Sequence, residues 1–324
     1  MQLQNSTFSI MRLDNVDPLI SVLNSLLLAK ETIVYLHVLP AGLKLTVERN
    51  KLVFAKAYLK ASLFAEYTFQ KGSGRVHDEH EELDHSLPDT IISHGNDLAS
   101  VNSSSFGLPL NRFLAALRIF SPNAHCSIRV PADRQCIELI LEEGGVISEC
   151  ILTCIESTES DDIRLSDELN IRSAPIIARA VAKSTHLKLA FAEVDIPGAQ
   201  LVHIKFNAEN PPYLEIMTRN EALSINVNLP FSATTDVFTD LSADENVEYF
   251  YHLSLLRPCL KVLQHADHTY IRINQNGMLS LQHILPTHDE RITNWIEFTI
   301  CAHDPHEDNG LMVSTQSQDS FDFD

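Results

Sequence analysis

The sequence lacks the marks of a membrane protein, a secreted disulfide protein and a fibrous protein. No apolar run approaches the ~20 residues that a membrane helix needs. The first residues show no basic stretch followed by an apolar core, so we expect no secretory signal. The six cysteines form no C-x-x-C pair and no zinc-like spacing, which predicts reduced thiols of an intracellular protein. The 44% hydrophobic and 21% charged residues are typical of a globular chain.

Positive charge is scarce. The chain has 24 Lys and Arg against 43 Asp and Glu, for a formal net charge of −19. A phosphate backbone repels such a chain if its charge is evenly spread, which argues against a nucleic-acid partner. The distribution of the charge therefore decides whether that argument holds.

One arrangement of apolar residues, at i, i+3, i+4 and i+7, occurs four times. The four sets are Leu19/Val22/Leu23/Leu26, Leu110/Phe113/Leu114/Leu117, Leu187/Ala190/Phe191/Val194 and Leu256/Cys259/Leu260/Leu263. Each set makes one apolar stripe on a helix of about three turns. We predict helices over 17–30, 108–119, 184–195 and 255–265.

Each predicted helix is surrounded by short runs rich in Val, Ile, Leu and Tyr and broken by Gly, Pro or Asn. Such runs predict strands and hairpins; they fall at 8–13, 33–38, 43–47, 126–130, 136–141, 176–181, 201–206, 213–218, 249–255, 270–273 and 279–285, with a further strand through Cys154. The sequence thus predicts a strand–helix–hairpin module repeated four times. Because 324 residues are long for one domain, we expect two similar α+β domains of two modules each, over 1–156 and 169–302, joined by a connector over 157–168.

Two segments lie outside the repeated pattern. Residues 71–97 are polar, acidic and rich in His, which is typical of a surface insertion. Residues 303–324 have the composition of an acidic disordered tail. In that tail Thr315 and Ser317 each precede a glutamine, so both are candidate phosphorylation sites for kinases that prefer Ser/Thr-Gln.

Basic residues gather on the four predicted helices. They are Lys30, Arg112, Arg118, Lys188, Arg257 and Lys261, against three acidic residues, Asp17, Glu193 and Asp195. At 3.6 residues per turn, all but Lys30 project away from the apolar stripes. This pattern favours a surface that contacts phosphates without reading sequence, although exposed helix faces ordinarily carry Lys and Arg and a simple solvated face is the alternative.

Four stretches resemble a known family. They are 141–146 (LEEGGV), 189–195 (LAFAEVD), 253–258 (LSLLRP) and 277–282 (GMLSLQ). Together with the four modules, they identify the chain as a member of the Rad one family, a subunit of the nine-one-one DNA-damage checkpoint clamp, and we expect a fungal member. The likeness covers most of 8–302 and excludes the insertion and the tail.

The resemblance implies a PCNA-like DNA clamp fold, with helices on one face and sheets on the other. It implies a heterotrimeric ring, formed with Rad nine and Hus one, that a clamp loader places around double-stranded DNA at damage sites in the nucleus. There the ring would act as a scaffold for checkpoint kinases and repair factors in the cell cycle. The DNA-facing residues would be Arg112, Arg118, Lys188, Arg257 and Lys261.

The resemblance also implies that edge strands pair neighbouring subunits. The two edges would fall at 146–153 and 221–229. Their apolar side chains are Val146, Ile147, Ile151 and Leu152 on the first and Leu223, Ile225, Val227 and Leu229 on the second. Ordinary edge strands of a monomer are the alternative.

No sequence pattern predicts catalysis. A metal-dependent exonuclease, an activity ascribed to this family, needs clustered carboxylates that hold two cations about 4 Å apart. The densest acidic cluster, 77–85, misses H-E-x-x-H because Asp84 occupies the second His position. A second cluster, Asp236, Asp240, Asp244 and Glu245, is predicted to be a polar loop. We expect no enzyme, metal site or cofactor; the alternatives are a 3'-5' DNA exonuclease and a homotrimeric replication clamp.

Overall fold

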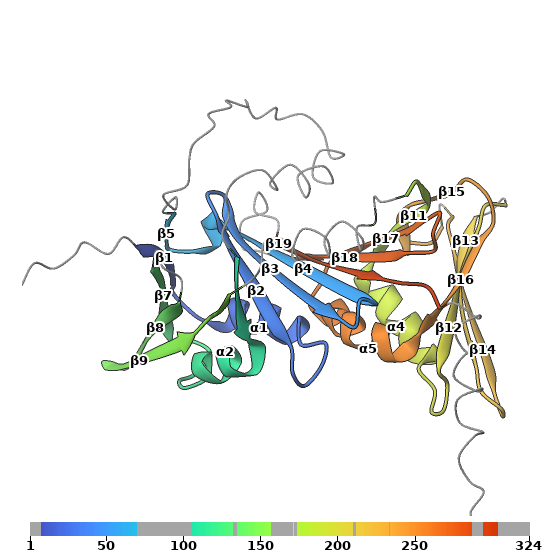
Figure 1. The fold of residues 1–324 in the computed structure, drawn as a ribbon. Coiled ribbons are helices and arrows are strands. Elements are labelled where there is room, and N and C mark those ends of the chain that lie inside the picture. The colour runs from blue at the N-terminus through green and yellow to red at the C-terminus, as the bar shows by residue number, and fades with distance from the viewer. Residues whose placement is uncertain are drawn as a thin grey trace, which may run out of the picture. The chain divides into compact units, whose positions relative to one another are not determined.

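The computed structural model describes residues 8–69, 105–131, 135–156, 171, 174–209, 212–232, 234–286 and 294–303 (Figure 1). The chain divides into two compact units. Unit 1 comprises Met1–Glu168 and His283–Glu297, and unit 2 comprises Leu169–Gln282 and Phe298–Asp324. Residues 283–297, which the sequence analysis assigns to the second domain, thus belong to unit 1. The division at 156 and 169 stays a prediction.

Each of the four apolar stripes forms a helix in the structure. The helices are α1 (Asp17–Ser25), α2 (Leu110–Leu117), α4 (Ser184–Val194) and α5 (Leu253–Leu260), and the short 3-10 helices are η1 (Ala61–Leu63) and η5 (Lys261–Gln264). Helix α1 ends at Ser25, five residues before its predicted end at Lys30. Leu26 and Leu28 are nevertheless buried, so the apolar pattern continues past the last helical turn and makes the helix look longer in the sequence.

Helix α5 begins two residues before its predicted start. The preceding strand ends at His252, and Leu253 and Leu255, which the sequence analysis places in that strand, are buried helical residues. Pro258 lies inside the helix and cannot donate a backbone hydrogen bond. The helix then tightens to 3-10 geometry in η5, which carries Lys261.

Two sheets build unit 1. Their strands are β1 (Phe8–Leu13), β2 (Ile33–Leu39), β3 (Gly42–Arg49), β4 (Val53–Lys60), β5 (Glu66–Thr68), β6 (Ser105–Pro109), β7 (His125–Pro131), β8 (Cys136–Glu143), β9 (Val146–Thr153) and β10 (Ile155–Glu156). One sheet has the order β5-β1-β7-β8-β9, and in the other β10, β6, β2, β3 and β4 are successive neighbours. Strand β9 therefore forms an edge of the first sheet.

Unit 2 repeats this plan. Its strands are β11 (Ile176–Lys183), β12 (Leu201–Asn207), β13 (Tyr213–Arg219), β14 (Ser224–Pro230), β15 (Phe238–Ala243), β16 (Val247–His252) and β17 (His268–Asn274), while β18 (Leu279–Leu285) and β19 (Asn294–Ile300) contribute residues to both units. One sheet has the order β14-β13-β12-β16, and in the other β18, β17, β11 and β15 are successive neighbours. Strand β14 is an edge, as β9 is in unit 1.

The two modules of each unit exchange their first strands. In unit 1, β1 precedes α1 but pairs with β7 of the second module, and β6 precedes α2 but pairs with β2 of the first. In unit 2, β11 pairs with β17 and β16 pairs with β12 in the same crossed manner. Neither module of a unit can complete a sheet alone, so each unit folds around two modules together.

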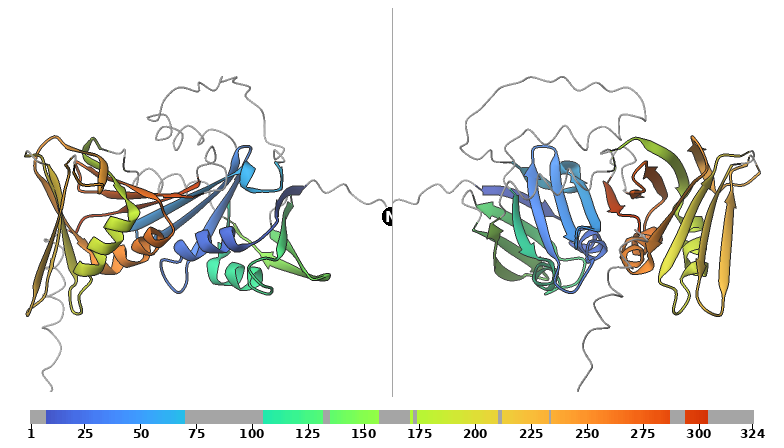
Figure 2. Two further views of the ribbon diagram at one scale, coloured as in Figure 1. Left: turned by 180° about the vertical axis from the view of Figure 1, so that it is seen from behind. Right: turned by 45° about the vertical axis from the view of Figure 1, so that its right-hand side comes forward.

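Within each unit the two helices lie side by side on one face, and the sheets form the opposite face (Figures 1 and 2). The helix stripes fill the cores: Leu19, Leu23 and Phe113 are fully buried in unit 1, as are Leu187 and Leu256 in unit 2. Burying a side chain of this kind contributes about 1.5–3 kcal/mol. The predicted α+β class and four-module plan are confirmed. In the part of the chain that the structure describes, no helix is long and apolar enough to cross a membrane.

Candidate nucleic-acid and subunit interfaces

In unit 1, the basic residues of the helices are exposed. Arg112 lies in the first turn of α2, and Arg118 caps its C-terminus. A guanidinium N–H of Arg118 donates to the Asn24 side chain of α1, so this arginine links the two helices. Lys30, just after α1, is also exposed. Arg112 has no ion pair among the described residues, which leaves its charge available to an outside partner.

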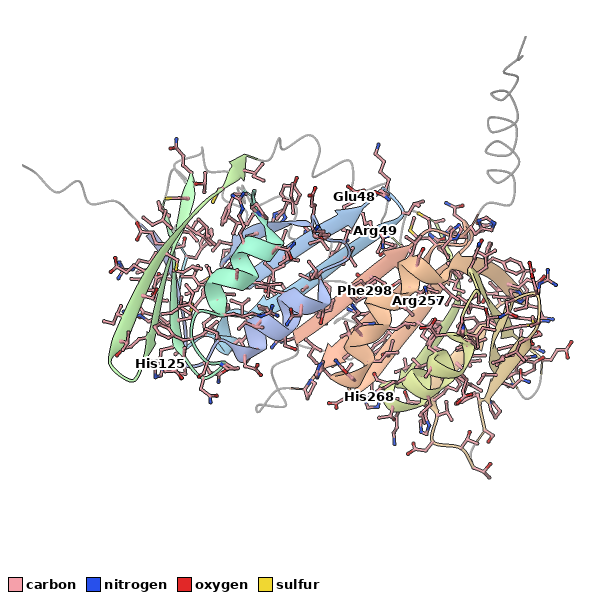
Figure 3. All side chains as sticks on the ribbon, turned by 90° about the horizontal axis from the view of Figure 1, so that it is seen from below. Glu48, Arg49, His125, Arg257, His268 and Phe298 are labelled. Carbon is pink, nitrogen blue, oxygen red and sulfur yellow. The ribbon has the colours of Figure 1, made fainter. Side chains whose placement is uncertain are left out.

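In unit 2, the three predicted DNA-facing residues differ in their surroundings. Lys188 on α4 and Lys261 on η5 are exposed and make no ion pair within the described part of the chain. Arg257 on α5, labelled in Figure 3, binds Asp195 at the end of α4, with Nη2 at 2.8 Å and Nε at 2.9 Å from the same Oδ1. Arg257 thus joins two helices, and its charge is already partly compensated.

Strand β9 is an edge with apolar side chains in water. It pairs in register with β8 and has no second neighbour among the described strands. Val146, Ile147 and Ile151 are 59%, 61% and 71% exposed, and Leu152 is half-buried. Isolated exposed apolar residues are common, but three on one open strand edge form an exposed apolar surface.

Strand β14 is an edge of a different kind. It pairs with β13 alone, and its exposure alternates along the strand. Ile225 and Val227 are half-buried on the side of α4, whereas Ser224, Asn226 and Asn228 are exposed. Leu223, predicted with this edge, precedes the strand in a turn and is 49% exposed.

The two edges also differ in where their backbone donors point. Cys154 N–H donates to Gln135 O at 2.8 Å, so these two residues form a hydrogen-bonded pair. Hydrogen-bonded and non-hydrogen-bonded pairs alternate along an antiparallel ladder. Ile151 and Glu138, three positions further along, are therefore a non-hydrogen-bonded pair. The N–H of Ile151 therefore points away from β8, toward the open edge.

In β14 the same reasoning gives the opposite result for Ile225. Asn220 N–H donates to Leu223 O at 2.9 Å, so the pair Thr218–Ile225 is hydrogen-bonded. The N–H of Ile225 points inward to β13, and the outward donors of this edge are those of Ser224, Asn226 and Asn228.

In the second acidic cluster, Asp236, Asp244 and Glu245 lie outside the strands, as predicted, and only Asp240 departs from the predicted loop. Asp240 lies in β15, where it forms an ion pair with Arg179 of β11 at 3.5 Å. Asp236 accepts a hydrogen bond from Lys183, and this contact lowers the pKa of the Asp236 carboxyl. Both carboxylates are thus paired with bases. An exposed edge strand accommodates Asp because the side chain faces water.

Among the residues that the structure describes, no three His, Cys, Asp or Glu side chains are grouped so that they could hold a metal ion. The segment 77–85 and the insertion 71–97 lie outside the described residues, as do Thr315, Ser317 and the tail beyond His303. All six cysteines are free thiols.

A side-chain clasp next to β9 was not expected from the sequence. The backbone N–H of Ser121 donates to Glu143 Oε2 at 3.0 Å, and the Ser121 hydroxyl donates to Oε1. These two hydrogen bonds lower the pKa of the Glu143 carboxyl. The partners are 22 residues apart, so no local sequence pattern reveals the contact.

A family model described as Repair protein Rad1/Rec1/Rad17 matches residues 8–285. The chain belongs to this family. It is 28% identical over 261 residues to the mouse cell cycle checkpoint protein RAD1 and 27% identical over 260 residues to the human one, covering 80% of each chain in both cases. The DNA damage checkpoint control protein rad1 of Schizosaccharomyces pombe is 23% identical over 259 residues, which cover 80% of this chain and 76% of that protein. The fungal source stays a prediction.

Solved clamp structures share the fold. The PCNA2–PCNA3 complex from Sulfolobus tokodaii contains a chain with a TM-score of 0.65 and 16% identity, covering 91% of this chain and 99% of that one. PCNA from Thermococcus kodakaraensis gives a TM-score of 0.64 and 17% identity, covering 92% and 100%. The predicted PCNA-like clamp fold of this Rad1 family member is confirmed.

Proposed function

We propose that the protein is a subunit of a heterotrimeric checkpoint clamp that encircles double-stranded DNA at damage sites in the nucleus. Its partners would be the Rad nine and Hus one subunits, and a clamp loader would place the ring. The ring would act as a scaffold for checkpoint kinases and repair factors, without a catalytic step of its own. The observation that carries the proposal is the Rad1 family match over 8–285 on a clamp fold.

The two strand edges support this assembly. A ring needs two unlike contacts per subunit when its three members differ, because each subunit has two different neighbours. Strands β9 and β14 offer one open edge in each unit, and they differ in side-chain chemistry. We assign the contact residues as Val146, Ile147, Ile151 and Leu152 on one edge and Leu223, Ile225 and Val227 on the other.

The assembly can be tested by co-expressing the chain with the two partner subunits and measuring the mass of the purified complex. We expect a complex with one copy of each subunit. A trimer formed by the isolated chain would instead favour a homotrimeric replication clamp. Digestion of labelled DNA by the purified chain that stops on addition of a chelator would favour the exonuclease.

The helices would face the DNA and contact phosphates without reading bases. Arg112, Lys188 and Lys261 have no ion pair in the described structure, so they are the strongest candidates. Arg118 and Arg257 are bound to Asn24 and Asp195, so their contribution should be smaller. An acidic protein can still hold DNA in this way, because a ring that slides needs only weak contacts.

We predict that changing Arg112, Lys188 and Lys261 together to Ala reduces the salt dependence of DNA binding by the assembled ring. Each phosphate contact contributes a slope of about −0.9 in a plot of log K against log salt. The control compares each single helix variant with Lys205→Ala, which removes one positive charge from strand β12 rather than from a helix. Fluorescence anisotropy at several salt concentrations measures the slope. An unchanged slope in the triple variant contradicts the assignment.

A further inference from the structure

The loop between α2 and β7 carries a serine that is unlike any other in the chain. Ser121 is followed by Pro122, and no other Ser or Thr of the 324 residues precedes a proline. Pro122 and Asn123 are exposed, and Ser121 is partly exposed. This loop therefore presents a Ser-Pro dipeptide to solvent, which is the feature that proline-directed protein kinases recognise.

The same serine holds the turn of the β8–β9 hairpin. Glu143 is the last residue of β8, and both of its carboxylate oxygens accept hydrogen bonds from Ser121. Asn123 N–H in turn donates to Ser121 Oγ at 3.3 Å. Pro122 O accepts from Val16 N at 3.1 Å, which anchors the loop to the start of α1. The loop is thus fixed, and Glu143 ties the hairpin to it.

Apart from the ladder, which pairs Glu143 with Val146, the two glycines of the turn have no side chains to hold it. Gly144 and Gly145 adopt φ angles of 59° and 81°, and no atom lies within 4 Å of the position that a Cβ would occupy on either. Beyond the turn lie Val146 and Ile147, whose side chains are exposed. The Ser121–Glu143 clasp is therefore the side-chain contact that fixes the start of the β9 edge.

We propose that Ser121 is a phosphorylation site of a proline-directed protein kinase and that phosphorylation opens the Ser121–Glu143 clasp. The kinase transfers the γ-phosphoryl group of a nucleoside triphosphate. A bond forms between Ser121 Oγ and the γ-phosphorus, the bond from that phosphorus to the β–γ bridging oxygen breaks, and the nucleoside diphosphate leaves. The hydroxyl proton passes to the catalytic base of the kinase.

The product cannot keep the clasp. The modified oxygen has no proton to donate, and a phosphate of charge about −2 faces the Glu143 carboxylate. Like charges at this distance repel, so the carboxylate leaves and the glycine turn loses its tether. The step changes the start of β9 and leaves the β8–β9 ladder in place. Its effect on subunit contacts rests on the proposed function, but the opening of the clasp does not.

The experiment uses the purified full chain, a proline-directed kinase and ATP, with the modified residue mapped by mass spectrometry. We expect phosphate on Ser121 and none on the Ser121→Ala or Pro122→Ala variants. Hydrogen exchange of the phosphorylated chain should then be about tenfold faster at Gly144 to Ile147, since a hydrogen bond to a charged group is lost. Ser121→Asp should reproduce the faster exchange.

Asn123→Asp is the matched control, because it places a negative charge in the same loop while Ser121 keeps its hydroxyl. Its exchange at the turn should equal that of the unmodified chain. The proposal is overturned if the folded chain is not modified at Ser121, or if exchange at the turn is unchanged. Slower exchange would overturn it too, since it would mean that the phosphate recruits a cation such as Arg118. Neither readout needs partner subunits, so a failure of the proposed assembly would be seen separately.

Discussion

Strands β9 and β14 occupy equivalent places in the two units, yet they are built in opposite ways. Each follows the hairpin of its module and pairs with one neighbour only. On β9 three of the exposed side chains are large and apolar, with Ile151 at 71%, and Glu149 and Thr153 are exposed beside them. On β14 Ile225, Val227 and Leu229 are half-buried, and the exposed side chains are Ser224, Asn226, Asn228 and the terminal Pro230. The β9 edge can thus present apolar side chains to a partner, whereas the β14 edge presents mainly backbone N–H and C=O groups.

The two edges should differ in how a partner gains binding free energy from them. Covering Ile147 and Ile151 removes apolar surface from water, at about 25 cal/mol per Å². Covering β14 buries mostly polar side chains, so its contact would depend on the outward N–H and C=O groups of the strand. We therefore expect the β9 contact to be sensitive to side chains and the β14 contact to be sensitive to backbone changes.

The largest expected effect comes from proline at outward donors. Ile151→Pro removes an N–H that points away from β8, so it should abolish one partner contact while the chain still folds. Asn228→Pro is the equivalent change on β14 and should abolish the other contact. Pull-down with each partner separately measures both losses, and circular dichroism checks the fold.

Ile225→Pro supplies the contrast to these variants. Its N–H points inward, so proline there removes a ladder bond to Thr218 and should destabilise the hairpin of β13 and β14. If Ile225→Pro kept its thermal transition and Ile151→Pro lost it, the assignment of inward and outward donors would be wrong.

Truncation of the apolar side chains of β9 should have a smaller effect, on partner binding and not on stability. Changing Ile147 and Ile151 together to Ser should weaken partner binding by about tenfold or more per residue, if each is buried in the contact. The thermal transition should hardly move, because both side chains are exposed in the isolated chain. Isothermal titration with the partner gives the affinity.

The same truncation on β14 should act on folding instead. Ile225 and Val227 are half-buried against their own unit, so changing both to Ser should lower the free energy of unfolding by about 1–3 kcal/mol. Urea unfolding measures this loss. Equal effects of the β9 and β14 variants on stability would remove the distinction between the two edges.

The sequence predicts the modules well, because apolar stripes such as Leu187 to Val194 are local and the helix period is strong. It does not predict where α1 ends, since buried Leu26 and Leu28 extend the pattern beyond the helix. Strand β15 escapes prediction because its acidic residue, Asp240, looks like a loop residue in sequence, whereas in the fold it pairs with Arg179 of β11. Paired carboxylates and solvated ones look alike in sequence.

The candidate interfaces show a similar division. The positions of both edge segments are implied by the family resemblance, and the exposure of the helix cations follows from the helix period. The direction of each backbone N–H cannot be predicted from the sequence of β9 or β14. Either set of alternate residues could donate to the neighbouring strand. The Arg257–Asp195 pair and the Ser121–Glu143 clasp also need the fold, since their partners are 62 and 22 residues apart.

The smallest expected effect concerns the isolated chain. An uncovered edge with apolar side chains tends to pair with another copy of itself, and charged residues on an edge oppose such pairing. We expect weak self-association through β9, with a dissociation constant on the order of 1 mM, that Ile151→Lys removes. Asn228→Lys, the same charge on β14, should leave it unchanged, because that edge offers little apolar surface. Sedimentation velocity across a concentration series measures the association. Loss of self-association in Asn228→Lys, or its persistence in Ile151→Lys, would show that exposed apolar side chains are not what separates the two edges.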